Sequence, residues 1–167
     1  ILISPMIVPL IITSAGMFFF YSKIGLTHTY LGLILAHTAL GTPFVVITVT
    51  ATLTGFDTNL IRASQSLGAD TMRTFFKVIM PLILPGVISG ALFAFITSFD
   101  EVVVVMFVGS VEQITIPKQM WAGLRQEISP VILCMATCLV ALSIALLTTV
   151  ELLRRRSERL RGIKLRN

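Results

Sequence analysis

Long runs without a charged side chain alternate with short polar segments along this chain of 167 residues. Four runs contain no Asp, Glu, Lys or Arg, and they cover residues 1–22, 24–56, 78–99 and 128–150. Each run is at least as long as the roughly 20 residues that a helix needs to cross the apolar part of a bilayer. The pattern predicts an all-α transmembrane protein with spanning helices near residues 4–22, 30–53, 84–108 and 130–152.

The polar segment between the second and third runs is longer than a connection between two spans requires. Residues 57–59 can supply capping side chains for a short amphipathic helix, which Gly68 ends. Asp70 can cap a second short amphipathic helix, which Met80 and Pro81 close before the next span. A hairpin of about five residues would be enough to join two spans. We therefore expect a bent pair of helices at the membrane surface, which contacts a partner.

Composition places the chain in a membrane. Hydrophobic residues make up 55% of it and charged residues 13%, and the mean hydropathy is +0.93. A soluble domain has roughly 25% charged residues. We expect a transmembrane domain over residues 1–153, a basic tail over residues 154–167 and no separate soluble domain. Because Ile1 begins inside an apolar run, we expect the chain to be the carboxy-terminal part of a longer protein.

The distribution of basic residues predicts the orientation. Residues 154–167 carry seven basic side chains and one acidic side chain, which places this end in the cytoplasm. Counting back through the spans places Arg62, Arg73 and Lys77 inside as well, whereas only three basic residues lie outside. A basic tail can also bind nucleic acid, but directly after a membrane helix the flanking-charge interpretation is preferred.

Two acidic residues of the third predicted span and a histidine of the second are candidates for a functional role. A carboxylate at the bilayer centre costs about 2.5–3.5 kcal/mol on insertion scales, so Asp100 and Glu101 in the third span need a role. They either face a translocation path, where they attract a cation or hold a gate, or pair with a basic or amide group on a neighbouring helix. His37 in the second span is either a hydrogen-bonded packing residue or part of a proton or substrate path.

The sequence contains none of the motifs that indicate catalysis. It has no phosphate-binding loop, no nucleophile elbow and no His/Cys cluster with metal spacing. Cys134 and Cys138 lie one helical turn apart in an apolar run, which is typical of small packing residues rather than of a disulfide or a metal site. The sequence therefore favours a transport subunit with no catalytic, cofactor or metal site of its own.

Residues 54–81 resemble the coupling motif of binding-protein-dependent ABC importer permeases, and we call them the coupling loop. In that motif Glu-Ala-Ala, three residues, Gly, nine residues, an apolar residue, one residue and Leu-Pro form the element that docks on the ATPase. Arg62 and Met80 depart from the glutamate and the leucine of the motif. The resemblance implies that the coupling positions are Arg62, Ala63, Ser64, Gly68, Ala69, Val78, Met80 and Pro81.

Further segments are similar to the spermidine/putrescine permeases, at residues 37–38, 42–46, 53–57, 98–104, 116–121 and 127–130. This resemblance implies the type I ABC importer fold, with the last four of its six spans present here. It also implies an ATPase partner that binds ATP and magnesium, a second permease subunit, and an extracytoplasmic binding protein that delivers a polyamine. The subunit would lie in the cell inner membrane, with its carboxy terminus cytoplasmic.

Three alternatives stay open. The first is an ABC permease for another solute, such as an amino acid, a sugar or an iron complex. The second is an ion-coupled secondary transporter in which His37, Asp100 and Glu101 relay protons. Such a transporter needs no amphipathic docking loop and usually shows paired repeats of broken helices, which the sequence does not contain. The third is a passive membrane scaffold, which the acids inside a span disfavour.

Overall fold

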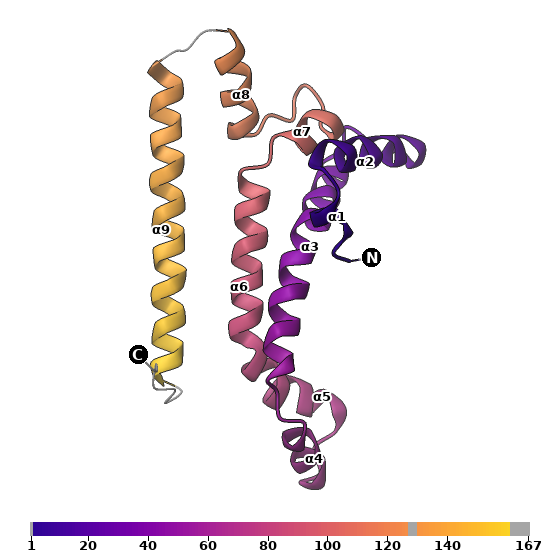
Figure 1. Ribbon diagram of the computed structural model, residues 1–167, viewed down its shortest axis with the longest axis vertical. Helices are drawn as coiled ribbons and strands as arrows, with labels where there is room; N and C mark the ends of the chain where they lie inside the picture. Colours follow the sequence, from indigo (N-terminus) through magenta and orange to yellow (C-terminus); the bar gives the residue numbers. More distant parts are fainter. Residues whose placement is uncertain (1, 127–129, 161–167) are drawn as a thin grey trace. The chain divides into compact units, whose positions relative to one another are not determined.

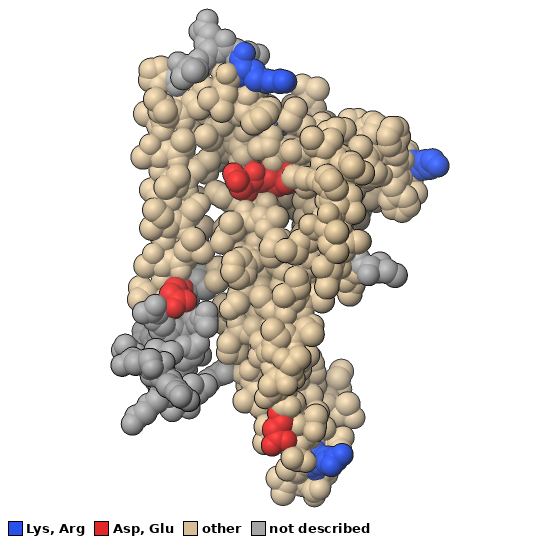
Figure 2. Space-filling view, viewed as in Figure 1, with Lys and Arg blue, Asp and Glu red and all other residues tan. Residues whose placement is uncertain are grey.

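The computed structural model describes residues 2–126 and 130–160, and all the regular structure within these ranges is helical (Figure 1). The chain divides into two compact units, Ile1–Thr115 and Ile116–Asn167, which are described separately. On the face drawn in Figure 2, charged side chains lie in a few separate places, and most of the remaining surface is uncharged. The prediction of an all-α protein is confirmed for the described residues.

Two long antiparallel helices, α3 (Tyr30–Thr54) and α6 (Met80–Phe99), pack side by side at the centre of the first unit (Figure 1). Small residues bring their backbones together. A Cβ atom built on Gly41 would lie 2.9 Å from the Cβ of Ala94, and one built on Gly90 would lie 2.7 Å from the Cα of Val45. Close packing of small residues is the usual way in which membrane helices associate.

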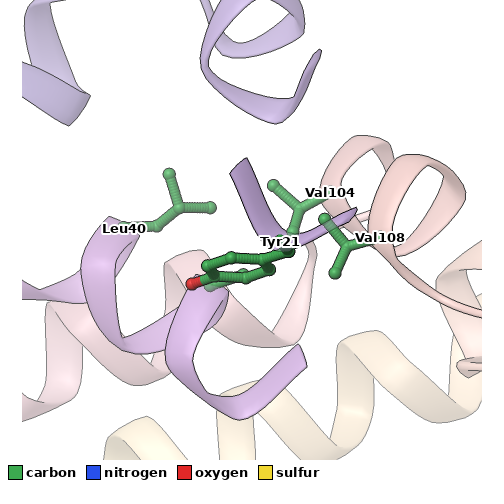
Figure 3. Close-up of a cluster of buried hydrophobic side chains, with 5 residues drawn as sticks. Tyr21, Leu40, Val104 and Val108 are labelled. Carbon is green, nitrogen blue, oxygen red and sulfur yellow. The ribbon is translucent and has the colours of Figure 1, made fainter. Parts of the chain in front are cut away.

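A compact apolar cluster closes one end of this helix pair. It joins α2 (Leu10–Ile24) and α7 (Val103–Val108) to α3. The buried members are Tyr21, Ala36, Leu40, Val104 and Val108, and Figure 3 shows the Tyr21 ring lying among the side chains of the other labelled residues. The cluster fixes α7 against α2 and α3. At the other end of the pair lie α4 (Asn59–Ser66) and α5 (Thr71–Thr74), which belong to the coupling loop.

The second unit consists of α8 (Ile116–Gln126) and α9 (Pro130–Leu160). Gly123 on α8 packs closely against Ile132 on α9, because a Cβ atom at Gly123 would lie 2.8 Å from the Cδ1 of Ile132. Cys134 and Cys138 on α9 are not joined in a disulfide. Helix α9 continues into the predicted tail as far as Leu160, and residues 161–167 of the tail lie outside the described residues.

Three helices in the described part of the chain are long and apolar enough to cross a membrane, and they cover Tyr30–Thr54, Thr71–Phe99 and Pro130–Thr149. The predicted first span is divided instead into α1 (Ser4–Ile7) and α2, which has 15 residues. Pro9 lies between them, and without an N–H group it cannot continue the hydrogen bonding of α1. The assignment of four spans therefore stays a prediction.

The predicted boundaries of the third span, 84–108, are wrong at both ends. The helix begins within the coupling loop and ends at Phe99, and a short turn separates it from α7. β-Branched residues crowd the region after this turn, where Val102 to Val105 follow one another and helix propensity is low. The acidic residues Asp100 and Glu101 therefore lie at a junction between two helices, and not inside one.

The expected end of the second loop helix at Met80 and Pro81 is also wrong. A single π-helical turn, η1 (Phe75–Ile79), joins α5 to α6, so the helix continues without a break. In this turn the N–H of Met80 donates to the carbonyl of Phe75, five residues earlier. Pro81, which has no N–H group to donate, follows this turn directly within the continuous helix. The wide π turn thus accommodates the proline.

Candidate coupling loop and helix-pair cavity

The turn at Gly68 gives the coupling loop its bend. Gly68 has a φ angle of +81°, a left-handed conformation that glycine adopts more readily than other residues. Its N–H donates to the carbonyl of Gln65 at 2.9 Å, and the N–H of Ala69 donates to the carbonyl of Ser64 at 3.1 Å. This pair of bonds is the Schellman arrangement that ends a helix and satisfies its last carbonyls. The prediction that Gly68 ends the first loop helix is confirmed.

A capping side chain defines the start of the second loop helix, as predicted, whereas the N-cap of the first, Thr58, makes no side-chain bond and Asp57 bonds from the position before it. An oxygen of Asp57 accepts a hydrogen bond from the N–H of Asn59 at 2.9 Å. An oxygen of Asp70 accepts one from the N–H of Arg73 at 2.9 Å, which makes Asp70 the N-cap of α5. These local bonds hold α4 and α5 at fixed points of the chain on either side of the Gly68 turn.

A hydrogen bond between hydroxyl groups connects the two loop helices. The Oγ of Ser64 on α4 lies 3.0 Å from the Oγ1 of Thr74 on α5. Thr74 is only 2% exposed, so its hydroxyl needs a partner within the protein. Ser64 stands where the resembling motif has its second alanine. The hydroxyl pair therefore adds a polar contact across the bend that the motif itself does not require.

The outer surface of the coupling loop is apolar and exposed. Leu67 next to the turn is 89% exposed, and Met72 is 67% exposed. Leu60 and Phe76 are exposed as well. Of the coupling positions, Arg62, Ala63 and Gly68 are exposed. The half-buried coupling positions are Ser64, Ala69, Val78, Met80 and Pro81. A surface that presents large apolar side chains around a fixed bend is suited to contact with another protein.

The junction between α6 and α7 separates the two acidic residues by environment. Glu101 is 6% exposed, and its Oε1 accepts a hydrogen bond from the N–H of Val104 at 2.8 Å. This bond satisfies one of the N–H groups that the start of α7 leaves without a partner in the helix. Asp100 is exposed at the end of α6. The structure thus gives Glu101 a backbone amide of the following helix as a partner, and its role in a translocation path stays a prediction.

A cavity of about 860 Å³ lies along the α3 and α6 pair in the first unit. Its walls are mainly apolar. His37 and Ser98 both line it and are hydrogen-bonded to each other, with 2.9 Å between the Nδ1 of His37 and the Oγ of Ser98. Of the predicted path residues, His37 lines this cavity, whereas Asp100 and Glu101 are not among the described residues that do so. The polar lining residues are Tyr30, His37, Thr38, Thr42, Ser98, Glu112, Gln113 and Thr115.

Sequence reasoning missed the acidic residue of this cavity, Glu112. The turn that carries it is held by a reciprocal pair of bonds, in which the N–H of Ser110 donates to the Oε1 of Gln113 at 2.9 Å and the N–H of Gln113 donates to the Oγ of Ser110 at 3.2 Å. This spacing of Ser and Gln three residues apart is the same as in a capping box. The pattern was therefore a signal for an ordered turn at residues 110–113.

Comparison with known proteins identifies similar chains over most of this length. The family model described as "Binding-protein-dependent transport system inner membrane component" matches residues 1–159. The chain is 32% identical over 152 residues to the spermidine/putrescine transport system permease protein PotC of Haemophilus influenzae, a match that covers 91% of this chain and 59% of the relative.

Two relatives from Escherichia coli K12 are similar at a lower identity. The spermidine/putrescine transport system permease protein PotC is 30% identical, and the match covers 90% of this chain and 57% of the relative. The putrescine transport system permease protein PotI is 28% identical, with 82% of this chain and 51% of the relative covered. The chain thus spans less than three-fifths of the length of these relatives.

Proposed function

The chain belongs to the family of binding-protein-dependent transport system inner membrane components, and we propose that it is part of a permease subunit that imports polyamines at the expense of ATP hydrolysis on a separate chain. It is a multi-pass membrane protein, since three of its helices are long and apolar enough to cross a bilayer. The named substrates of the similar permeases, spermidine and putrescine, support the choice of solute. We place the coupling loop and the carboxy terminus in the cytoplasm.

The geometry of the coupling loop is the observation that carries this proposal. After α4 the chain turns at Gly68 and returns through α5 into α6. Leu67, Met72 and Phe76 are exposed around this bend. A secondary transporter has no use for such a projection, whereas a permease driven by a soluble ATPase needs a docking element of this kind. We assign the contact with the ATPase to the α4 side of the bend. Arg62, in place of the motif glutamate, presents a positive charge there.

The remaining partners follow from the same proposal. The ATPase subunits bind ATP and magnesium, a second permease subunit completes the pathway, and an extracytoplasmic binding protein supplies the solute. The last three coupling positions, Val78, Met80 and Pro81, lie in η1 and the first turn of α6. Any displacement of the coupling loop at the ATPase therefore acts directly on a helix that crosses the membrane.

Removing the Ser64–Thr74 hydroxyl pair is expected to slow uptake without preventing assembly. Ser64→Ala and Thr74→Val each remove one partner of the bond and leave the size of the side chain almost unchanged. Loss of such a bond costs about 1 kcal/mol, so we expect uptake to fall about fivefold. The initial rate of ATP-driven polyamine uptake in proteoliposomes measures the effect.

Two further variants make this prediction specific. Ser66→Ala removes an exposed hydroxyl from the same helix and should leave the rate unchanged. Because both single variants break the same bond, Ser64→Ala combined with Thr74→Val should be no slower than either one alone. Losses that simply multiply in the double variant would show that the two hydroxyls act independently.

We assign the translocation path to the side of the α3 and α6 pair that carries the cavity and the α6–α7 junction. His37 contributes a polar point within the cavity, where it is paired with Ser98. Asp100, exposed at the end of α6, attracts a polycation toward this side. Glu101 serves the structure, because its carboxylate holds the start of α7 through the amide of Val104.

Asp100→Asn is expected to lower the uptake of spermidine and putrescine, because it removes a charge from the path and preserves the shape of the side chain. Loss of one favourable charge interaction of about 1 kcal/mol corresponds to roughly a fivefold lower rate. Uptake kinetics in vesicles, together with the amount of permease and ATPase in the membrane, measure the effect. Unchanged kinetics would remove Asp100 from the path.

Glu101→Gln is the matched control for Asp100→Asn. Glutamine retains an amide oxygen that can accept the hydrogen bond from Val104, so this variant should keep both its fold and its uptake rate. An equal loss of uptake in the two variants would indicate that both acids belong to one structural network.

The function itself is tested by reconstitution of the full-length permease with its ATPase and its binding protein. We expect ATP-dependent accumulation of radiolabelled spermidine or putrescine, and no accumulation of amino acids, sugars or iron complexes. Accumulation of one of these other solutes would retain the importer and replace the substrate. Uptake that follows an ion gradient and does not require ATP would contradict the proposal.

A further inference from the structure

We propose that the cavity along α3 and α6 is a binding site for an alkyl diamine or polyamine, with Glu112 as the counter-charge and with Thr38 and Thr42 as acceptors. This inference rests on the proposed function, which it extends from the path as a whole to one site and three side chains. Asp100 and Glu101 are not needed for it, since the cavity is lined by other residues.

The size and walls of the cavity suit a flexible hydrocarbon chain. Its volume of about 860 Å³ is within the range of small-molecule sites. Apolar side chains of α3 and α6 contribute much of the lining, among them Leu33, Ile34 and Phe95. Methylene groups are favourably removed from water by such walls. Phe95 and Tyr30 add aromatic faces, to which ammonium groups are attracted.

The charges around the cavity favour a cation. Among the described residues that line the cavity, Glu112 is the only carboxylate, and neither Lys nor Arg is found there. The remaining ionisable residues of the described lining are Tyr30 and His37, and His37 is hydrogen-bonded to Ser98. The turn stabilised by Ser110 and Gln113 holds Glu112 at the cavity, and Gln113 is only 6% exposed. An anionic ligand would meet a negative charge here, and a cation would meet its counter-charge.

The two threonines of the cavity restrict the ligand further, because their hydroxyl protons are already engaged. The Oγ1 of Thr38 donates to the carbonyl of Ile34 at 2.7 Å, and the Oγ1 of Thr42 donates to the carbonyl of Thr38 at 2.7 Å. Each hydroxyl oxygen therefore offers only lone pairs to a ligand. An ammonium group has only donors to offer, and it complements such acceptors.

The spacing of these acceptors fits a diamine. Thr38 and Thr42 are four residues apart on α3, which corresponds to about 6 Å along the helix axis. Two amines at the ends of an extended four-carbon chain have a similar separation. A sugar or an amino acid would bring hydroxyl or carboxylate acceptors to positions where the protein itself offers acceptors. The lining thus selects a ligand with several amines and no acceptor.

The test is equilibrium dialysis of radiolabelled putrescine and spermidine against the purified full-length permease–ATPase complex, without the binding protein. We expect Glu112→Gln to weaken binding at least tenfold and Glu112→Asp to weaken it less than threefold, which corresponds to about 1.4 kcal/mol and less than about 0.7 kcal/mol. Thr42→Val should weaken binding several-fold, because it replaces an acceptor by a methyl group. Binding that is unchanged in Glu112→Gln would overturn the inference.

A charge-relocation variant separates a ligand contact from a general effect of net charge. Val111 precedes Glu112, is 88% exposed and does not line the cavity. The double variant Val111→Glu with Glu112→Gln keeps the net charge and moves the carboxylate by one residue. We expect binding to stay weak in this variant. Recovery of binding would show that the charge acts at a distance, and would also overturn the inference.

Uptake measured on the same preparation distinguishes this inference from the proposed function. If the unmodified complex, supplied with its binding protein and ATP, accumulates polyamines but Glu112→Gln binds them normally, the site is wrong and the function stands. If the unmodified complex accumulates no polyamine, the proposed function fails first, and the site fails with it. Gel filtration of each variant confirms that the complex is intact before either measurement.

Discussion

Replacing Gly68 with aspartate is expected to abolish ATP-driven uptake while the permease still inserts normally into the membrane. The left-handed backbone at φ +81° costs a residue with a Cβ atom about 1 kcal/mol, and the new carboxylate stands next to the exposed Leu67 on the surface that we assign to the ATPase. No other atom lies within 4 Å of a Cβ built at Gly68, so the variant can fold. Co-purification of the ATPase and uptake into vesicles measure the outcome.

Gly25 provides a matched control at the other end of the first unit. It also has a left-handed conformation, with φ +71°, and a Cβ atom there meets no other atom within 4 Å. Gly25→Asp therefore introduces the same charge and the same backbone strain far from the coupling loop. This variant should still co-purify with the ATPase. If Gly68→Asp keeps both uptake and the ATPase, the loop is not the coupling element.

Replacing Gly90 with valine is expected to disrupt the permease itself. A Cβ at Gly90 would lie 2.7 Å from the Cα of Val45 and would also meet the side chain of Thr48. A backbone atom cannot rotate away, so α3 and α6 must separate. Overpacking of this kind costs about 1–3 kcal/mol, which lowers the melting temperature by roughly 3–10 °C for a protein of this size. Thermal denaturation in detergent, followed by size-exclusion chromatography, measures the shift.

Gly16 on α2 is the matched control for this second prediction. It is also a helical glycine, but a Cβ atom there meets nothing within 4 Å. Gly16→Val makes the same change in helix propensity without a clash, and its melting temperature should stay close to that of the unmodified protein. Equal shifts in the two variants would show that propensity, rather than contact between α3 and α6, sets the effect.

Local rules were sufficient for the bend of the coupling loop. Gly68 and Asp70 could be assigned from the sequence because their roles depend on bonds to residues two to four positions away, and the structure places both as predicted. The apolar run of α3 was equally clear, and its predicted range of 30–53 differs from the observed helix by one residue. Elements whose stabilising contacts lie close in sequence are the ones that a sequence reveals.

The boundaries of the third span could not be read in the same way. The uncharged run does end at Phe99, but hydrophobicity resumes from Val102 to Val108, and the predicted span was therefore extended through the two acidic residues. The break depends on Glu101, whose carboxylate accepts a hydrogen bond from the N–H of Val104 in the first turn of α7. It also depends on the apolar cluster that holds α7 against Tyr21. Likewise, Pro81 normally ends a helix, and only the π turn before it lets the helix continue.

The cavity could not be predicted from the sequence, because its lining comes from four separate segments. His37 and Ser98 are 61 positions apart, and Glu112 lies in a turn that resembles an ordinary polar connection. The apolar pattern also drew attention to Asp100 and Glu101, since they seemed to lie inside a span. In the structure they lie at its end, where one carboxylate is exposed and the other is satisfied by a backbone amide.

In the coupling that we propose, the continuous helix from Thr71 to Phe99 serves as a lever. Its 29 residues correspond to about 43 Å at 1.5 Å per residue, so a tilt of about 5° at one end displaces the other end by about 4 Å. That displacement is comparable to the diameter of a methylene chain. Close contacts at glycines tie α3 to α6, so in the proposed coupling both helices tilt together. A small displacement at the coupling loop then moves the opposite end of the helix across the thickness of the bilayer, and the path opens or closes without a hinge within the helix.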